Sequence, residues 1–244
     1  QTDWYIDQMK RPAYDSPSLP ITWDRMEYVE GTNEYVPVRP EYKKSIDALC
    51  AEAEKQALSG NTEALVNVKK EVGENPYEHK NRLKYWRRSE NEDLKVIPTD
   101  SIVMKVDKEA VRRSGMMIPG DSIPDYMHIS LKGKRALYKS ELMMLEMLAE
   151  ANWERPIYIA VSVGPENQLN MGNHFIQEGL TYRFTPFDTD TLGVTIVSET
   201  MYDNLMHTFK FGGIDKPGLN IDDNPIPMCP SHRPIFLQLP HHLI

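Results

Sequence analysis

The chain has 244 residues, enough for one large domain or two small ones, and its 40% hydrophobic and 26% charged residues are typical of a globular protein. Its formal net charge of -8, from 28 basic and 36 acidic residues, argues against nucleic acid as the main partner, because duplex binding depends on neutralising phosphates. No apolar run reaches the roughly 18 residues needed to cross a bilayer, and no signal peptide is visible. Since the chain opens on Gln1 rather than Met, we expect it to be a piece of a longer protein.

Residues 1–39 are predicted to form an irregular segment packed on the main body. Its prolines forbid long helices, and its Trp and Tyr side chains supply surface for packing. Within it, residues 6–9 predict one helical turn, and "EYVPV" at residues 34–38 predicts a short edge strand, where a proline is tolerated.

Residues 40–95 are predicted to be a helical region. Apolar residues recur with a 3.6-residue period from Pro40, which suits a first helical turn, to Gly60, which suits a C-cap. A second helix is predicted over "TEALVNVKKEVG", ending at Gly73, and the charged residues 74–95 are predicted to be an exposed excursion.

Residues 96–213 alternate between strand and helix patterns, and this alternation predicts an α/β domain. The fold class expected is α/β: a layered domain with a mixed, partly parallel sheet flanked by helices, plus the irregular N-terminal segment. The predicted strands and helices, in chain order, are strand 101–107, helix 108–115, strand 126–131, helix 137–151 with Ser140 as its cap, strand 156–163, helix 169–179, strand 180–187 and helix 198–213.

The run "PIYIAVSV" at residues 156–163 is continuous and apolar, which favours a central strand covered on both faces. The preceding "NWER" is interpreted as the joint between helix and strand, with Trp153 packed beneath it.

Residues 214–244 form a Pro-rich C-terminal tail. Its prolines cannot all lie inside a regular helix, because each interior proline costs about 3 kcal/mol or more. The two cysteines, Cys50 and Cys229, allow one disulfide but define no framework, and Cys50 on an apolar helix stripe is interpreted as a small buried side chain.

No phosphate-binding loop, dinucleotide fingerprint, nucleophile elbow or paired zinc spacing is present, so no cofactor and no metal are predicted. The best candidate site is "GPENQLNMGN", which follows the carboxyl end of the strand predicted at residues 156–163, where ligands of α/β sheets bind. The predicted binding residues are Glu166, Asn167, Asn173 and His174. No catalytic residue is assigned.

Four blocks resemble a family of large multi-spanning membrane proteins catalogued as domain of unknown function 2723. They are "TDWYIDQMKR" at 2–11, residues 136–164, "FIQEGLTYRFTP" at 175–186 and "TMYDNLMHTFKFGG" at 200–213. Members look like membrane-embedded glycosyltransferases of the C-type superfold, related to protein O-mannosyltransferases. The resemblance implies that this chain is a soluble domain on the extracytoplasmic (periplasmic) face, tethered through upstream transmembrane helices.

The resemblance implies a parent that uses a lipid-linked sugar donor and carries its catalytic acid in a membrane loop outside this chain. We therefore expect a domain that is not catalytic by itself and that serves acceptor or partner recognition, or docking. Its partners would be the membrane-embedded portion of the same polypeptide and a glycan or acceptor peptide. The alternative is a stand-alone small-molecule-binding or hydrolase-like α/β enzyme with its site at residues 164–174. For the tail, the resemblance predicts a helix that the prolines argue against.

Overall fold

The structure, a computed structural model, describes residues 4–30, 34–73, 75–80, 95–118, 122–210, 217–218 and 228–243. It forms two compact units. Unit 1 comprises Gln1–Ser114 and Ile123–Arg155, and unit 2 comprises Gly115–Ser122 and Pro156–Ile244. The domain boundaries expected from the sequence stay predictions.

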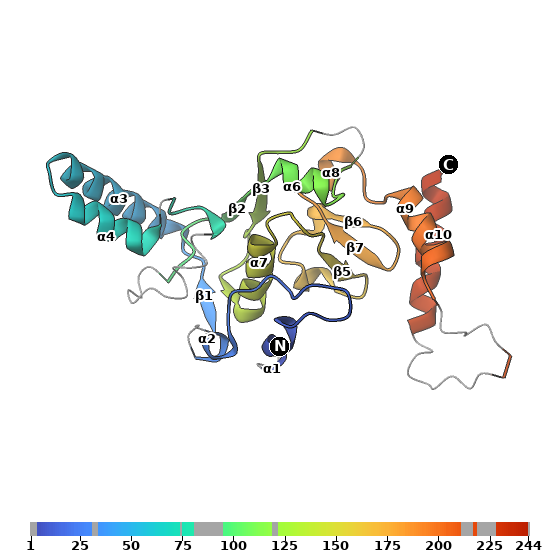
Figure 1. Cartoon of the computed structure of the whole chain (residues 1–244). Helices are drawn as coiled ribbons and strands as arrows, with labels where there is room; N and C mark the ends of the chain where they lie inside the picture. Colours follow the sequence, from blue (N-terminus) through green and yellow to red (C-terminus); the bar gives the residue numbers. More distant parts are fainter. Residues whose placement is uncertain are drawn as a thin grey trace. The chain divides into compact units, whose positions relative to one another are not determined.

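The N-terminal segment of unit 1 carries helix α1 (Trp4–Met9), helix α2 (Arg25–Val29) and strand β1 (Tyr35–Pro37), as Figure 1 shows. The helical turn and the edge strand expected there are confirmed. Strand β1 pairs antiparallel with strand β4 (Ala136–Tyr138), which the sequence had assigned to the start of a helix. Trp23 anchors the segment, since its side chain is 0% exposed.

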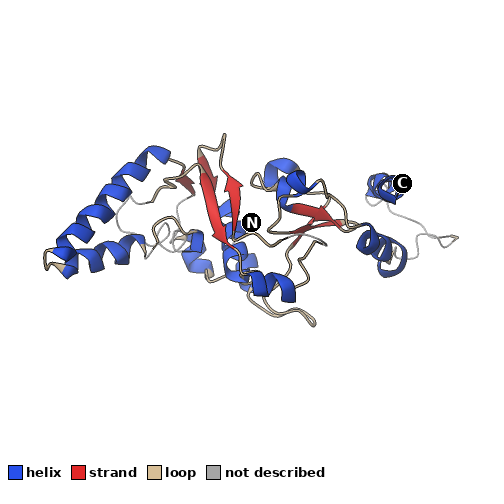
Figure 2. Ribbon diagram, turned by 90° about the horizontal axis from the view of Figure 1, so that it is seen from above, coloured by secondary structure: helices blue, strands red, loops and turns tan. Residues whose placement is uncertain are grey.

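Helices α3 (Lys43–Leu58) and α4 (Thr62–Val72) run side by side as a hairpin (Figures 1 and 2), preceded by the 3-10 turn η1 (Pro40–Tyr42). This confirms both helices predicted from apolar period and glycine stops. Gly60 and Gly73 have φ of +103° and +80°, a conformation that ends a helix and suits glycine. Cys50 packs against buried Ile46 and Val72, whereas the side chain of Cys229 and residues 81–94 lie outside the described residues.

Strands β2 (Ser101–Lys105) and β3 (Tyr126–Ser130) form an antiparallel pair in which Val103 lies opposite His128. Both strands were predicted, and alternate residues of each are buried. Helix α6 (Lys108–Arg113) follows β2.

Helix α7 (Lys139–Ala151) has more buried residues than any other described helix of unit 1. Leu142, Met143, Leu145 and Leu148 are each at most 5% exposed. The expected cap at Ser140 is wrong, because the helix begins at Lys139 and its N-cap is Tyr138, two residues before Ser140. Glu141 instead stabilises the first turn, since its Oε2 accepts a hydrogen bond of 2.9 Å from the backbone N–H of Tyr138.

Unit 2 holds a three-stranded antiparallel sheet with the order β5-β7-β6, built from β5 (Tyr158–Ala160), β6 (Phe175–Gln177) and β7 (Thr181–Phe184). Strand β7 confirms the strand predicted at residues 180–187. The expectation of a buried central strand at 156–163 is wrong: β5 has three residues, lies at the edge, and leaves Tyr158 46% exposed. The chain turns after β5, where the N–H of Val163 bonds the carbonyl of Ala160 at 3.0 Å.

The helix predicted at residues 169–179 is also wrong. Leu169 and Asn170 have φ of +50° and +56°, a left-handed conformation that a right-handed helix cannot contain. The chain makes two short 3-10 turns, η3 (Pro165–Asn167) and η4 (Gly172–His174), before entering β6.

Arg183 of strand β7 lies in a buried ion pair and also bonds to Gly115 of the short segment Gly115–Ser122. The Nε of Arg183 lies 2.7 Å from Oε1 of Glu178, with both side chains 6% exposed. Nη1 of Arg183 also donates to the carbonyl of Gly115 at 2.6 Å. This network explains why that segment belongs to unit 2.

The C-terminal part of unit 2 is helical: α8 (Thr189–Leu192), α9 (Ser198–Asp203), the π-helical turn η5 (Asn204–Thr208) and α10 (Met228–Leu243). The helix predicted from residue 198 is confirmed, and it ends before Phe209. The prediction that prolines keep the tail from being helical is wrong over α10, which contains Pro234 and Pro240, whereas residues 219–227 lie outside the described residues. The buried Ile235 and Leu239 of α10 belong to one apolar cluster with residues of α9 and η5, and this packing offsets the lost backbone hydrogen bonds.

The α/β fold class with flanking helices is confirmed, but the sheet arrangement differs from the mixed sheet expected. The named strands of the described chain pair only antiparallel, in three small sheets (Figure 2), and parallel pairing is confined to isolated bridges such as Glu78 with Val103. A parallel pair needs a long crossover, whereas β6 and β7 are joined by a tight turn.

Candidate binding cavity

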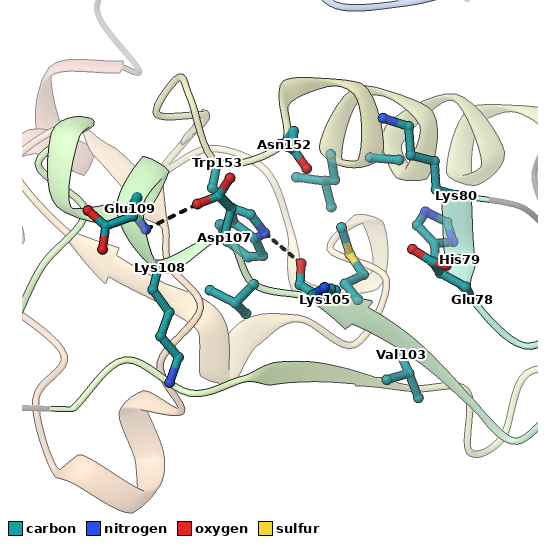
Figure 3. Close-up of a pocket in the computed structure, with 14 residues that line it drawn as sticks. Glu78, His79, Lys80, Val103, Lys105, Asp107, Lys108, Glu109, Asn152 and Trp153 are labelled. Atoms are coloured by element: carbon teal, nitrogen blue, oxygen red, sulfur yellow. Dashed lines mark hydrogen bonds between the residues drawn. The ribbon is translucent and has the colours of Figure 1, made fainter. Parts of the chain in front are cut away.

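A cavity of about 440 Å³ lies within unit 1 (Figure 3). One wall is the end of β2 with the residues that follow it, 103–109, a second is the C-terminal end of α7, and residues 78–80 close one end. The volume falls in the range of small-molecule sites, and the lining combines apolar side chains with a few polar ones, as such sites do.

The wall formed by β2 is held by a helix cap at Asp107 and by a bridge from Val103 to Glu78. Asp107 caps helix α6, because its Oδ1 accepts hydrogen bonds from the N–H groups of Glu109 and Ala110 at 3.1 and 3.0 Å. On the same strand, Val103 bridges to Glu78, which attaches the segment carrying the end wall to β2. The sequence therefore builds this wall from a strand, a capped turn and one bridge.

Trp153 forms the wall at the end of α7. Asn152 and Trp153 have φ of +43° and +63°, so two successive left-handed residues turn the chain sharply out of the helix. The indole is 4% exposed, and its Nε1 donates to the carbonyl of Lys105 at 2.9 Å, as the dashed line in Figure 3 shows. The hydrogen bond joins helix α7 to strand β2 directly across the cavity wall.

The two residues after Trp153 confirm the scaffold interpretation of this corner. Glu154 pairs with Arg113 at 2.7 Å, and Nη1 of Arg155 donates to the carbonyls of Pro17 and Ser18 at 3.1 and 3.0 Å. Arg155 thereby holds the N-terminal segment in place rather than facing the cavity.

His79 is the most unusual residue of the cavity. Its side chain is 3% exposed, and its Nε2 lies 3.0 Å from the carbonyl oxygen of Leu145 on α7. A carbonyl only accepts, so Nε2 carries the proton, and Nδ1 of the neutral ring carries a lone pair. Within the part of the chain that the structure describes, this buried Nδ1 has no hydrogen-bond partner.

Burial lowers the pKa of His79 from 6.5 to about 4, and the hydrogen bond to the Leu145 carbonyl opposes this shift only in part. The ring is therefore neutral at pH 7, and its buried Nδ1 carries a lone pair. A buried acceptor without a donor costs free energy, which a ligand hydroxyl or amide N–H would recover.

Charges of both signs surround the cavity. Lys108 is neutralised by Asp125, with Nζ 2.8 Å from Oδ1. Glu78, Lys80 and Lys105 contribute further charged groups to the lining. Because no single sign dominates, the lining suits a neutral, hydroxyl-rich or amide-bearing ligand rather than a highly charged one. Among the residues described, no group of three or more His, Cys, Asp or Glu side chains could hold a metal ion.

The four residues predicted as a site occupy unit 2. Glu166 and Asn167 are exposed on η3, where Nδ2 of Asn167 donates to Oε1 of Glu166 at 3.1 Å. His174 is 4% exposed on η4, with Nδ1 2.9 Å from the carbonyl of Phe187. Asn173 donates to Asp188 at 3.2 Å.

Asp188 joins the pair Asn173 and His174, an association the sequence did not reveal. Its carboxylate caps α8, and the N–H of Thr191 at 3.0 Å is the largest cause that lowers the pKa of this carboxyl. None of these residues lines the 440 Å³ cavity.

The cavity escaped sequence reasoning because its parts lie far apart along the chain. His79 bonds a carbonyl 66 residues away, and Trp153 bonds one 48 residues away. The one local signal was "NPYEH" at residues 75–79, a turn followed by a polar aromatic cluster in an otherwise charged stretch.

A family model described as TMEM260-associated domain 2 matches residues 1–203. The matched span includes every residue that lines the cavity. Neither the curated proteins nor the solved structures contain a match to this chain. No helix in the described ranges has both the length and the apolar character needed to cross a membrane.

Proposed function

Because the chain belongs to the family of TMEM260-associated domain 2, a domain associated with a membrane protein, we propose that it is the extracytoplasmic recognition domain of an integral membrane glycosyltransferase-like protein. The family match supports the membrane association. The four blocks that resemble membrane-embedded glycosyltransferases support the class of the parent. The domain itself is non-catalytic and holds the acceptor, a glycan or a peptide.

The cavity at His79 is the observation that carries this role. Sugar hydroxyls and peptide amides are donors that pair with the Nδ1 of His79, while the apolar lining of Val106, Leu148 and Trp153 covers less polar parts of the ligand. A recognition domain needs such a recess but no nucleophile or metal of its own.

A binding screen with a cavity-filling variant tests the proposal. The chain is titrated with a panel of mono- and oligosaccharides and short Ser/Thr-containing peptides, and binding is read as a rise in melting temperature. Ala149 lines the cavity on α7, so Ala149→Leu fills it; Ala51→Leu adds the same side chain at an exposed position of α3 and serves as the control.

The proposal is supported if a ligand stabilises the wild-type chain and Ala51→Leu but not Ala149→Leu. A ligand that stabilises all three chains equally would show that it does not bind in the cavity. If no compound of the panel stabilises the wild-type chain, acceptor recognition is contradicted.

The proposed partner is the membrane-embedded portion of the same polypeptide, with the domain on the periplasmic side. The test is protease protection of the full-length parent in sealed membranes. Cleavage within this domain from the extracytoplasmic side supports the placement, and protection from that side contradicts it.

The alternative, a small-molecule-binding or hydrolase-like site at residues 164–174, is favoured by one observation, the grouping of Asn173 and His174 with Asp188. The same panel tests it with Asn173→Ala. Loss of stabilisation in that variant and not in Ala149→Leu would move the site to unit 2.

A further inference from the structure

A second pocket of unit 1, of about 520 Å³, has four basic residues among the nine that line it. We name it the basic pocket and define it by Arg39, Lys132, Lys134 and Arg135, with Asp100 as the one acidic residue of its lining. This local excess of positive charge occurs in a chain whose net charge is -8.

Backbone hydrogen bonds fix the walls of the basic pocket. The N–H of Val38 bonds the carbonyl of Arg135 at 2.9 Å, and the N–H of Arg39 bonds the carbonyl of Ile97 at 2.8 Å. These two bonds hold the backbone at Arg39 and Arg135 beside β1 and the 97–100 segment. The positions from which the two guanidinium groups extend are therefore set before any ligand arrives.

A tight turn presents the lysines. The N–H of Lys134 bonds the carbonyl of Leu131 at 2.9 Å, and Gly133, the third residue of this turn, has φ of +85°, which favours glycine. A Cβ at Gly133 would meet no atom within 4 Å, so the turn borders open space through which a ligand can approach. The N–H of Leu131 also bonds the carbonyl of Asp100 at 2.8 Å, which ties the turn to the opposite wall.

The basic residues differ in how their charge is balanced. Lys134 pairs with Glu141, with Nζ 2.6 Å from Oε1 and both side chains largely covered. Arg39, Lys132 and Arg135 form no ion pair with the acidic side chains that the structure describes. Three cations without such an ion pair and one carboxylate, that of Asp100, therefore belong to the lining of one recess.

We propose that the basic pocket binds a phosphate group through Arg39, Lys132 and Arg135. Phosphate offers several acceptor oxygens around one phosphorus atom. A guanidinium group can donate two parallel hydrogen bonds to these oxygens, and an ammonium group adds a point charge. The group belongs either to a soluble phosphate compound or to an anionic lipid headgroup. The proposal does not rest on the acceptor cavity, whose lining carries both signs of charge.

The test is calorimetric titration of the 244-residue chain with inorganic phosphate and pyrophosphate at constant ionic strength, together with sedimentation with phosphatidylcholine vesicles with and without phosphatidic acid. The variant is R39Q/K132Q/R135Q. Its control, K44Q/K55Q/K70Q, removes the same formal charge from exposed positions of the α3–α4 hairpin. All replaced side chains are exposed, and circular dichroism checks that both variants stay folded.

We expect saturable binding that weakens about tenfold or more in R39Q/K132Q/R135Q and changes little in the control, because charge-assisted pairs dominate such sites. Binding of phosphate or pyrophosphate identifies a soluble source, and binding of phosphatidic acid vesicles alone identifies a headgroup. The proposal is overturned if the wild-type chain binds none of these probes, or if the control loses as much affinity as the pocket variant.

Discussion

The two units each bury a histidine, and the two side chains have different roles. His79 in unit 1 and His174 in unit 2 are 3% and 4% exposed, and each bonds a backbone carbonyl, at 3.0 and 2.9 Å. His79 keeps a buried Nδ1 without a partner among the described residues and lines a cavity. His174 lies beside Asn173 and the carboxylate of Asp188, in a network that joins η4 to α8.

The difference shows that burial alone does not identify a binding site. A buried polar group marks a site when one of its hydrogen-bonding positions is left for a ligand, and it marks scaffold when local groups satisfy it. By this criterion unit 1, rather than the stretch 164–174, carries the better candidate site.

The largest effect is expected from Trp153→Ala, which removes the wall of the cavity. The indole is 4% exposed and bonds the Lys105 carbonyl, so we expect a loss of about 3–5 kcal/mol in the free energy of unfolding. Urea denaturation measures it. Trp4→Ala, at a side chain 55% exposed, is the control and should cost less than about 1 kcal/mol. Equal losses in the two variants would show that the wall is not packed as described.

The second effect is a pH dependence that originates in His79. Its pKa is about 4 in the fold and about 6.5 when unfolded, so below pH 6.5 the unfolded chain binds a proton that the fold does not. The contribution to stability is full above pH 6.5 and falls by up to about 3 kcal/mol as the pH drops towards 4.

His79→Gln keeps a donor for the Leu145 carbonyl but does not titrate, so its stability should fall less steeply over this range than that of the wild type. The comparison is made by urea denaturation at pH 7, 5.5 and 4. His207→Gln, at a side chain 64% exposed, is the control. An unchanged slope in His79→Gln would show that the ring is not buried and neutral.

The smallest effect belongs to the His174 region. Asp188→Ala removes the cap of α8 and should cost about 1 kcal/mol at pH 7. Since the pKa of Asp188 is lowered in the fold, this contribution is present above the unfolded pKa of about 3.9 and is lost as the pH falls below it. Asp190→Ala in the same helix is the control. If Asp188→Ala lost ligand binding rather than stability alone, the contrast between the two units would fail.

Sequence reasoning succeeded where the signal is local. The helices α3 and α4 were predicted from helical patterns that stop at Gly60 and Gly73, and strands β2 and β3 from the short runs at residues 101–107 and 126–131. These patterns report the burial of one face, which each element's own residues encode.

The failures come from contacts that no local pattern encodes. The apolar run at residues 156–163 does not show that β7 takes the central place in the sheet. The backbone at Leu169 and Asn170 is left-handed although neither residue is glycine, so no residue type in the sequence indicated it. In α10, packing of Ile235 and Leu239 against α9 and η5 outweighs the prolines. The cavity depends on partners 48 and 66 residues apart, so the α/β class was predictable and the site was not.

The most direct test of the account is the ring-nitrogen spectrum of the chain labelled with ¹⁵N-histidine, recorded at pH 7 with and without a ligand from the glycan and peptide panel. The account predicts that His79 is neutral, with Nε2 protonated and Nδ1 bare, and that the ligand shifts the Nδ1 resonance of His79 and leaves His174 unmoved. A protonated His79, or a ligand that shifts His174 instead, would contradict the assignment of the site to this cavity.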